Sequence, residues 1–493
     1  MREQSGQAHT LTMKPINGLR LEILSAEQIR QIHWSSLEIL EQTGVRVRYA
    51  PLLERLRDHR AFVDFDSQVV RFPASLVESA LRKAPSRFTW HGRDPRHDIP
   101  LGEDKVHFLG ASTMITVYDL QGQRRPATFQ DLKDFSLLKD GLPNINDGYG
   151  AVHPQDVPEA AAHAYSMLGQ FSNSTKPGRA RMLGWDVSQD CLRMAQIVAG
   201  GEERFAQRPN LLAVVNTLSP LTNAPQQLEA LWVYAEANAP LFFSPQIQAG
   251  ATGPVTLAGL LVQMNAEILA GITMAQLVNP GCRVGYGTTS GIMDMRQGLM
   301  PYATPESCLI NIATAQLARF YRIPSRGTGG FTEANTLDMQ AGFETALTTA
   351  AAALAGINII IGAGGSLQNA LGASFAKFVV DNEINGFIKR LCQGIQFIPE
   401  TLALDVIKAV GPAGQFLTER HTVDHFRQEL FRPGLSNRQA YESWVEAGSN
   451  PIHEQARAEA RRILREHQPE PLPQQVEAEL WAVVRAAERR GQS

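Results

Sequence analysis

The sequence predicts an α/β protein whose main body is a (β/α)8 TIM barrel. From Leu142 onward, short apolar runs alternate with longer helical stretches, as in strands joined by crossover helices. This alternating part is about 260 residues long, which is typical of a closed barrel. An open doubly wound sheet is the alternative that the alternation leaves open.

Seven short apolar runs are the predicted strands, and a weak eighth follows them. The strands are Ile145–Val152, Arg179–Gly184, Leu211–Ser219, Leu241–Gln246, Arg283–Thr288, Ile323–Thr328 and Ile357–Ile361, with the weak eighth at Gln396–Phe397. The predicted helices are Glu159–Phe171, Ser188–Val198, Gln226–Ala237, Thr256–Leu277, Pro305–Tyr321, Met339–Ala355 and Phe375–Gly394.

The barrel, residues 141–400, is expected to lie between two regions of other character. Residues 1–140 are predicted to be an α+β amino-terminal region, in which Ser25 and Gln28 form a capping-box signature for a first helix. Residues 401–493 are mostly helical and charged, and we expect this extension to serve as a docking or oligomer contact.

The composition excludes several classes of protein. A hydrophobic content of 44% with 19% charged residues is typical of a soluble globular chain, and a net charge of −3 argues against nucleic-acid binding. We find no apolar run long enough to span a bilayer; the longest candidate, Ala350–Gly365, is interrupted by Asn358. The start of the chain lacks an export core, and the four cysteines form no Cys-x-x-Cys pair. We therefore expect a cytoplasmic protein.

Small and polar residues follow several predicted strands. The stretch Ile323–Glu344 passes from a strand into Gly329-Gly330 and a polar loop, and similar residues occur at Ser219–Thr222, Gln246–Gln248, Gly285–Ser290 and Gly362–Ser366. Because parallel strands of a barrel end together, these loops should share one face, where barrel enzymes keep their active sites. Turn formation without a ligand is the plainer interpretation of each loop taken singly.

No other motif indicates a defined chemistry. Gly285-Tyr286-Gly287 matches a dinucleotide loop only in part, and Gly362–Gly365 alone is weak evidence for a phosphate site. His421 and His425 stand four apart, as metal ligands on a helix can, but no third ligand is near them in the sequence. No Gly-x-Ser-x-Gly elbow occurs. The residues alone predict a barrel enzyme with little acid–base machinery.

Long strings of the sequence resemble the trimethylamine methyltransferase family. They include NAPQQLEAL, VGYGTTSGIMDMRQG, SRGTGGFTEANTLDMQAGFETALT and FLTERHTVDHFRQEL. The resemblance implies a (β/α)8-barrel methyltransferase that moves a methyl group from an amine to the cobalt of a corrinoid. That corrinoid, of the cob(I)alamin type, would be carried by a separate small protein, with no metal or nucleotide bound directly by this chain.

The resemblance also implies a substrate class. Founding members carry pyrrolysine at the end of the sixth strand, and the matching position here is Phe331, directly after Gly329-Gly330. The chain is therefore similar to the branch without pyrrolysine, whose members act on quaternary amines such as glycine betaine. The run Thr332-Glu333-Ala334-Asn335 departs from the Thr-Asp-Ser-Lys of many relatives.

A quaternary amine leaves as a neutral amine, so the protein has to position and desolvate the cation rather than deliver a proton. We expect Phe331 and Glu333 to act directly, with aromatic rings around the cation. Core packing is the competing role for each ring. The residues predicted to bind the substrate are Tyr149, Trp185, Phe243, Tyr286, Phe331 and Phe343, Glu333 or Glu383 for charge, Arg326 and His153 for a carboxylate, and the backbone of Gly329 and Gly330.

Gly364, Gly365 and Ser290 are predicted to allow the corrin ring to approach the barrel rim. The expected partners are the corrinoid protein, the quaternary amine and further copies of this chain. Two alternatives stay open: a betaine-binding barrel without catalysis, and a lyase or isomerase that uses Glu333 as its base.

Overall fold

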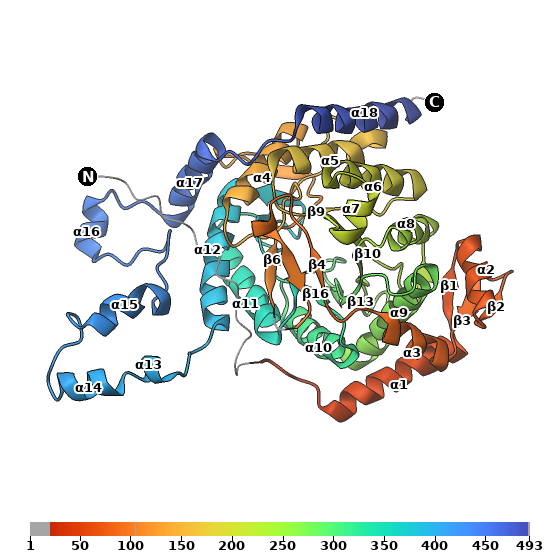
Figure 1. Cartoon of the computed structure of the whole chain (residues 1–493), viewed down its shortest axis with the longest axis horizontal. Coiled ribbons are helices and arrows are strands. Elements are labelled where there is room, and N and C mark those ends of the chain that lie inside the picture. The colour runs from red at the N-terminus through yellow and green to blue at the C-terminus, as the bar shows by residue number, and fades with distance from the viewer. Residues whose placement is uncertain (1–19, 104, 492–493) are drawn as a thin grey trace.

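A seven-stranded parallel sheet forms the centre of the protein, and helices surround it (Figure 1). The computed structural model describes residues 20–103 and 105–491. The strand order is β6-β17-β16-β14-β12-β10-β9. The strands are β6 (His107–Leu109), β9 (Gly178–Arg179), β10 (Leu211–Val215), β12 (Leu241–Phe243), β14 (Val284–Gly287), β16 (Ser325–Thr328) and β17 (Ile359–Ile361).

From β9 to β17, each strand of the sheet lies beside the next one along the chain. A doubly wound sheet would instead reverse its strand order at a switch point, so the order excludes that alternative. The sheet is built as predicted from Leu211 onward, although the strands are shorter than expected. The chain thus has an α/β fold with a curled parallel sheet.

Two predicted strands were wrong. Neither Ile145–Val152 nor Gln396–Phe397 is a strand, and β6, from the predicted amino-terminal region, occupies an edge of the sheet instead. The segment near Ile145 still reaches both edges, because the Asn146 N–H donates to Phe108 O at 2.8 Å and the Gly148 N–H to Pro177 O at 3.0 Å. The Asn146 side chain also accepts the Phe108 N–H at 2.8 Å, and such side-chain bonds compete with a regular ladder.

The predicted helices are present. Those around the sheet are α4 (Phe129–Gly141), α5 (Ala162–Asn173), α6 (Trp185–Ala199), α8 (Pro225–Glu236), α9 (Leu257–Val278), α10 (Pro305–Tyr321), α11 (Met339–Ala355) and α12 (Phe375–Cys392), with the short α7 (Glu202–Gln207) after α6. Contrary to our expectation, α9 is long and apolar enough to cross a membrane by length and composition alone. It packs against the sheet and against α1 (Ala26–Gln42), and most of it is buried, as in a core helix.

The amino-terminal region consists of short elements around α1. The capping box of Ser25 and Gln28 at its start is confirmed. The further elements are β1 (Val45–Val47), α2 (Ala50–Asp58), β2 (Phe62–Asp64), β3 (Val69–Arg71), α3 (Ala74–Lys83), β4 (Phe88–Trp90), β5 (Ile99–Leu101), β7 (Thr116–Tyr118) and β8 (Arg124–Pro126). The short strands β11 (Thr222–Asn223), β13 (Gln248–Ala249), β15 (Gly291–Ile292), β18 (Ser366–Leu367) and β19 (Gly372–Ser374) come from loops of the central body, and β11 pairs with β1 while β19 pairs with β7. Since β6 lies within residues 1–140 and pairs with β17, the amino-terminal region and the sheet share one core; the division at residues 140 and 400 stays a prediction.

The carboxyl-terminal part has two different halves. Residues 393–450, which we call the arm, project from the body in Figure 1 and hold α13 (Pro399–Leu402), α14 (Leu404–Val410), α15 (Arg420–Glu429) and α16 (Tyr441–Glu446). None of these four helices has a buried residue. In contrast, α17 (Ile452–Glu466) packs on α12 and α4, and α18 (Gln474–Arg490) packs on α5 and α6.

Candidate functional site

A buried arginine, Arg326 of β16, reaches with its side chain the residues that directly follow β12 and β14. Its side chain lies beside Gly287 of the neighbouring strand β14, where an added Cβ would come 3.0 Å from the Arg326 Cβ. Nη1 donates to Thr289 Oγ1 at 2.8 Å, to Thr288 O at 3.2 Å and to the Ser244 hydroxyl. Arg326 is only 6% exposed, so this guanidinium is held in place by hydroxyls of two adjacent loops.

The other edge of the Arg326 guanidinium has no partner. Nε is buried without a hydrogen bond, and Nη2 donates none within the described ranges. No carboxylate among residues 20–103 and 105–491 forms an ion pair with Arg326. Burial lowers the pKa of Arg326 to about 9, and the positive charge of Arg179 acts in the same direction. A buried cation without a counter-charge is costly, which makes this edge a candidate ligand contact.

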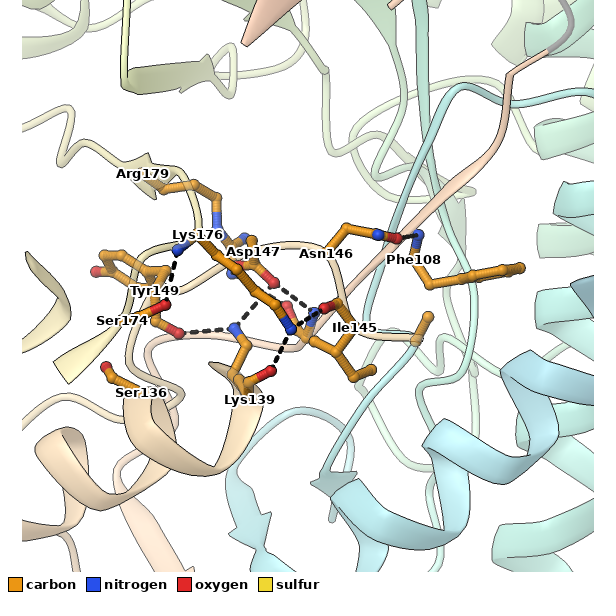
Figure 2. A network of polar contacts seen from close by, with 12 residues as sticks. Phe108, Ser136, Lys139, Ile145, Asn146, Asp147, Tyr149, Ser174, Lys176 and Arg179 are labelled. Atoms are coloured by element: carbon orange, nitrogen blue, oxygen red, sulfur yellow. Dashed lines mark hydrogen bonds and ion pairs between the residues drawn. The ribbon is translucent and has the colours of Figure 1, made fainter. Parts of the chain in front are cut away.

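A second cluster of charges surrounds Asp147 (Figure 2). Its carboxylate lies 2.9 Å from Lys139 Nζ and 3.0 Å from Arg179 Nη2, and it accepts the Gly110 N–H at 3.0 Å. Burial alone would raise the pKa of Asp147, but the two cations lower it below its usual value. Burial lowers the pKa of Lys139 to about 8. One carboxylate therefore serves two cations, and the cluster carries an excess of positive charge.

Tyr149 connects this cluster to the strand ends. Its carbonyl accepts from Lys139 Nζ at 2.7 Å, and the Arg179 guanidinium lies over its ring at 4.9 Å from the centroid. The nearby Tyr149 side chain also raises the pKa of Arg181. Arg181 Nη2 lies 3.2 Å from His153 Nδ1, and His153 Nε2 lies 3.0 Å from Glu159 Oε2. The structure thus brings together the predicted Tyr149 and His153 with two arginines.

Phe331 lies under an aromatic neighbour that the sequence did not predict. The Tyr302 ring stacks on it, and the Tyr302 hydroxyl accepts from Gln246 Nε2 at 2.9 Å. Phe331 is 7% exposed and packs against Gly362, where a Cβ would collide with its ring. Gln246, which donates to the Tyr302 hydroxyl, lies two residues after Ser244, which accepts from Arg326, so one loop contacts both the aromatic pair and the arginine.

Glu333 fixes the loop that carries Tyr302. Its carboxylate accepts the Tyr302 N–H at 2.7 Å and the Ala303 N–H at 3.2 Å. Burial raises the pKa of Glu333, these N–H groups oppose the rise, and the charge of nearby Glu344 adds to it. Glu383 does a similar task elsewhere: it accepts N–H groups of residues 434–436, on the arm.

The glycine loops after β16 and β17 pack on each other. Gly330 has a φ of +83°, and a Cβ there would lie 2.6 Å from Gly362 O, so only glycine suits the position. Gly329 donates its N–H to Ile361 O at 2.9 Å. Gly330 donates its own to Thr348 Oγ1 at 2.9 Å. The two glycines therefore hold neighbouring strand ends together and place Phe331.

The residues predicted to contact the corrin ring are inside the protein. A Cβ on Gly364 or Gly365 would meet the Phe378 ring, and the Gly365 N–H donates to Asp381 Oδ2 at 2.7 Å. Ser290 is 2% exposed, and its hydroxyl donates to Pro245 O and accepts the Ile247 N–H. Their role toward a corrin stays a prediction that none of these contacts supports.

Four predicted aromatic contacts lie apart from Phe331. Tyr286 is fully buried and donates its hydroxyl to Asn265 of α9 at 2.8 Å, and Phe243 is fully buried against Gly271 of the same helix. Trp185 and Phe343 begin or lie on outer helices and are 40% and 58% exposed. Among the described residues, none of the four has a ring contact with Tyr302 or Phe331.

The pair His421 and His425 lies on α15, with ring centroids 4.4 Å apart. Within the described ranges, no group of three or more His, Cys, Asp or Glu side chains could hold a metal ion. The two histidines therefore have no third ligand beside them there.

Sequence reasoning missed Tyr302, Arg179 and Asp147 as site residues. Arg179 begins a predicted strand, and a charged residue inside an apolar run is the signal that could have identified it. Asp147 falls in the wrongly predicted strand Ile145–Val152. Tyr302 follows no strand, and only its place between Pro301 and the helix cap Thr304 marks it as a loop aromatic.

Three comparisons with known proteins agree with one another. The chain matches the family model described as "Trimethylamine methyltransferase (MTTB)" over residues 1–492. It is 36% identical over 468 residues to the glycine betaine methyltransferase of Desulfitobacterium hafniense (strain Y51), across 94% of this chain and 97% of that one. It is 35% identical over 474 residues to the trimethylamine methyltransferase MttB of Desulfitobacterium hafniense (strain DSM 10664 / DCB-2), across 96% and 95% of the two chains.

A solved structure is also similar. The chain described as "Crystal structure of the hydroxylamine MtmB complex" aligns with a TM-score of 0.54 and 10% identity, across 92% of this chain and 89% of that one. At this identity the similarity shows the fold alone.

Proposed function

The chain belongs to the trimethylamine methyltransferase family and is a methyltransferase; from this premise we propose that it takes a methyl group from a quaternary amine. The acceptor in this proposal is the Co(I) of a corrinoid on a small partner protein. Glycine betaine is the first candidate donor, because a relative that shares 36% of its residues is named for it. The single observation that carries the proposal is the stack of Tyr302 on Phe331 at the strand ends, and the family resemblance implies that Phe331 takes the pyrrolysine position.

The aromatic pair suits a permanent cation. A ring face attracts a quaternary ammonium with about 0.5–2 kcal/mol, and more where water is excluded. Tyr302 is held by Gln246 through its hydroxyl and by Glu333 through its N–H. The ammonium would therefore meet a fixed aromatic surface with a carboxylate behind it, and the protein contributes orientation and desolvation.

The methyl transfer itself requires no proton from the protein. Co(I) supplies an electron pair that forms the new bond to the methyl carbon, while the C–N bond breaks and its electrons stay on nitrogen, which leaves as a neutral amine. The lyase or isomerase alternative would need Glu333 as a free base, whereas the structure has its carboxylate accepting two backbone N–H groups. A betaine-binding protein without catalysis would bind the amine but give no turnover.

We also propose that the barrel is completed by the irregular segment around Asn146 and Gly148, which lies between β6 and β9. Its hydrogen bonds to Phe108 O and Pro177 O support an eighth position in the ring. The seven strands and this segment then alternate with the eight longer helices from α4 to α12, the short α7 being an addition after α6.

The proposed homo-oligomer rests on the arm. Phe397 and Leu417 are 76% and 79% exposed there, and none of α13 to α16 buries a residue. Short helices without a buried face, and exposed apolar side chains beside them, gain stability from packing against another surface. We propose a second copy of this chain as that surface, and a cytoplasmic location, which suits four free cysteines.

The test is a reaction with purified protein. Co(I) corrinoid and candidate quaternary amines are supplied, and methyl-Co(III) formation is followed by its absorbance. Methylation with at least one quaternary amine is expected. Tight binding of the amine without methylation would instead favour the non-catalytic alternative.

A further inference from the structure

Arg326 presents an unused guanidinium edge, and the loop from Ser244 to Gln246 contacts both this arginine and Tyr302. Within the part of the chain that the structure describes, the three hydrogen bonds of Arg326 all leave from Nη1, while Nε is buried with no partner. The Nε–Nη2 edge is the fork that matches the two oxygens of a carboxylate. An arginine with a purely structural role would donate hydrogen bonds from this edge to other groups of the protein.

The charges around Arg326 also favour a ligand with an anionic group. The positive charge of Arg179 acts on Arg326, and the carboxylate that pairs with Arg179, Asp147, also serves Lys139. A substrate with only a positive charge would add a cation to this excess. A substrate with one positive and one negative group could place the ammonium on the rings and the anion on the guanidinium.

The surroundings also give Arg326 a fixed position. The hydroxyls of Ser244 and Thr289 hold Nη1 from the loops after β12 and β14, and the two hydroxyls lie 3.1 Å apart. Gly287 leaves room for the arginine stem. A fixed fork loses little freedom when it binds a planar anion.

We propose that Arg326 receives the carboxylate of a zwitterionic quaternary amine, and thereby makes the enzyme selective for betaines over quaternary amines without a carboxylate. This inference rests on the proposed function, and it specifies the substrate class of the same site. Arg326 acts as a specificity-determining residue, and the Tyr302–Phe331 pair holds the other end of the molecule.

The experiment compares two ligands with the full-length protein by calorimetry, in the absence of corrinoid. Glycine betaine carries the carboxylate, and choline has the same trimethylammonium group without it. The wild type should bind glycine betaine at least tenfold more tightly than choline. Arg326→Gln should weaken glycine betaine binding about 30-fold, as expected for hydrogen bonds to a charged group, and change choline binding less than threefold.

Two further variants keep the result interpretable. Arg326→Lys keeps the charge and loses the fork, so it should lose part of the glycine betaine affinity even if Arg326→Gln does not fold. Arg283→Gln is the matched control, because Arg283 precedes β14 at the opposite end of the strands and donates to Asn238 O and Ala206 O. It should leave both affinities unchanged.

Several outcomes would overturn the inference. One is equal affinity of the wild type for glycine betaine and choline. Another is an equal loss of affinity for the two ligands in Arg326→Gln. Inorganic phosphate that binds the wild type more tightly than glycine betaine, and needs Arg326 to do so, would assign the edge to a phosphate instead. Methyl transfer from choline with unchanged rates in the variant would reject the subsite and retain the proposed function. Betaine binding that depends on Arg326 but leads to no methyl transfer would support the subsite and reject the proposed function.

Discussion

The Tyr302 ring stacks on the Phe331 ring, with centroids 4.7 Å apart and planes 29° from parallel. The two residues are brought together by different elements, since Phe331 follows β16 and Tyr302 precedes α10. The stack joins two loops at the carboxyl ends of the strands and forms the aromatic surface on which the proposed function depends.

Phe331→Leu should weaken binding of a quaternary ammonium ligand about fivefold, because it removes one ring face worth about 1 kcal/mol. Leucine retains much of the buried volume, so the fold should survive. Calorimetry with glycine betaine measures the effect. Phe387→Leu is the control: this half-exposed ring of α12 contacts Phe431, remote from the strand ends, and its loss should not change affinity. Equal affinities in all three proteins would show that Phe331 does not contact the cation.

Glu333→Gln should lower affinity for the ammonium a few-fold, since it removes a negative charge behind the aromatic pair and retains one acceptor oxygen for the loop. Glu383→Gln is a close match, because Glu383 also accepts several backbone N–H groups but faces the arm. It should cost stability without changing affinity. If both variants chiefly lower the melting temperature, Glu333 is structural as well.

Asp147→Asn should destabilise the protein by about 3–5 kcal/mol, because it leaves Lys139 and Arg179 buried without their shared counter-charge. Urea unfolding measures this change in the free energy of unfolding. Asp58→Asn breaks the exposed pair with Arg57, also 2.9 Å long, and should cost less than about 1 kcal/mol. Similar losses in the two variants would contradict the assigned role of Asp147.

The pH dependence of stability should include a contribution from His107 of β6. Burial lowers the pKa of His107 to about 4 in the folded protein, against 6.5 for the free side chain. A lowered folded pKa means that the contribution is complete above pH 6.5 and is lost as the pH falls toward 4. Urea unfolding measures the free energy of unfolding at each pH. Between pH 7 and pH 4.5 this free energy should fall by about 2 kcal/mol less in His107→Gln than in the wild type. An unchanged difference would show that His107 is not held neutral.

The arm can be tested by light scattering. Phe397→Glu with Leu417→Glu should lower the molecular mass in solution, because two charges would face the second copy, and the melting temperature of the body should change little. Phe62→Glu is the control, since Phe62 is 61% exposed on β2 and lies outside the arm. A mass that stays the same in both proteins would reject the arm as the contact.

Much of the fold could be predicted from periodicity, because the long helices from α5 to α12, all but the short α7, bury apolar residues. The strand near Ile145 could not be predicted correctly. Its apolar residues match a strand, but hydrogen bonds of the Asn146 side chain and neighbouring Gly148 replace the ladder. Strand β6 was not recognised as part of the central sheet. Its three residues are too short a pattern to be distinguished from the other strands of the amino-terminal region.

The site could be predicted only where the local sequence marks it. Gly329-Gly330 and Phe331 stand in a loop that follows a strand, so their place followed from the chain itself. Tyr302 reaches Phe331 through a contact between distant segments, which no local pattern encodes. Tyr286 was wrongly expected at the site, because its glycine-rich surroundings suggested a loop. It lies in a strand instead, and strand alternation turns its ring toward α9.

The most direct measurement is the absorbance change on mixing Co(I) corrinoid with this protein and glycine betaine. We expect conversion to methyl-Co(III) with release of the demethylated amine in equal amount, and no conversion when the amine is omitted. A corrinoid spectrum that stays unchanged with glycine betaine and every other quaternary amine tried would contradict it.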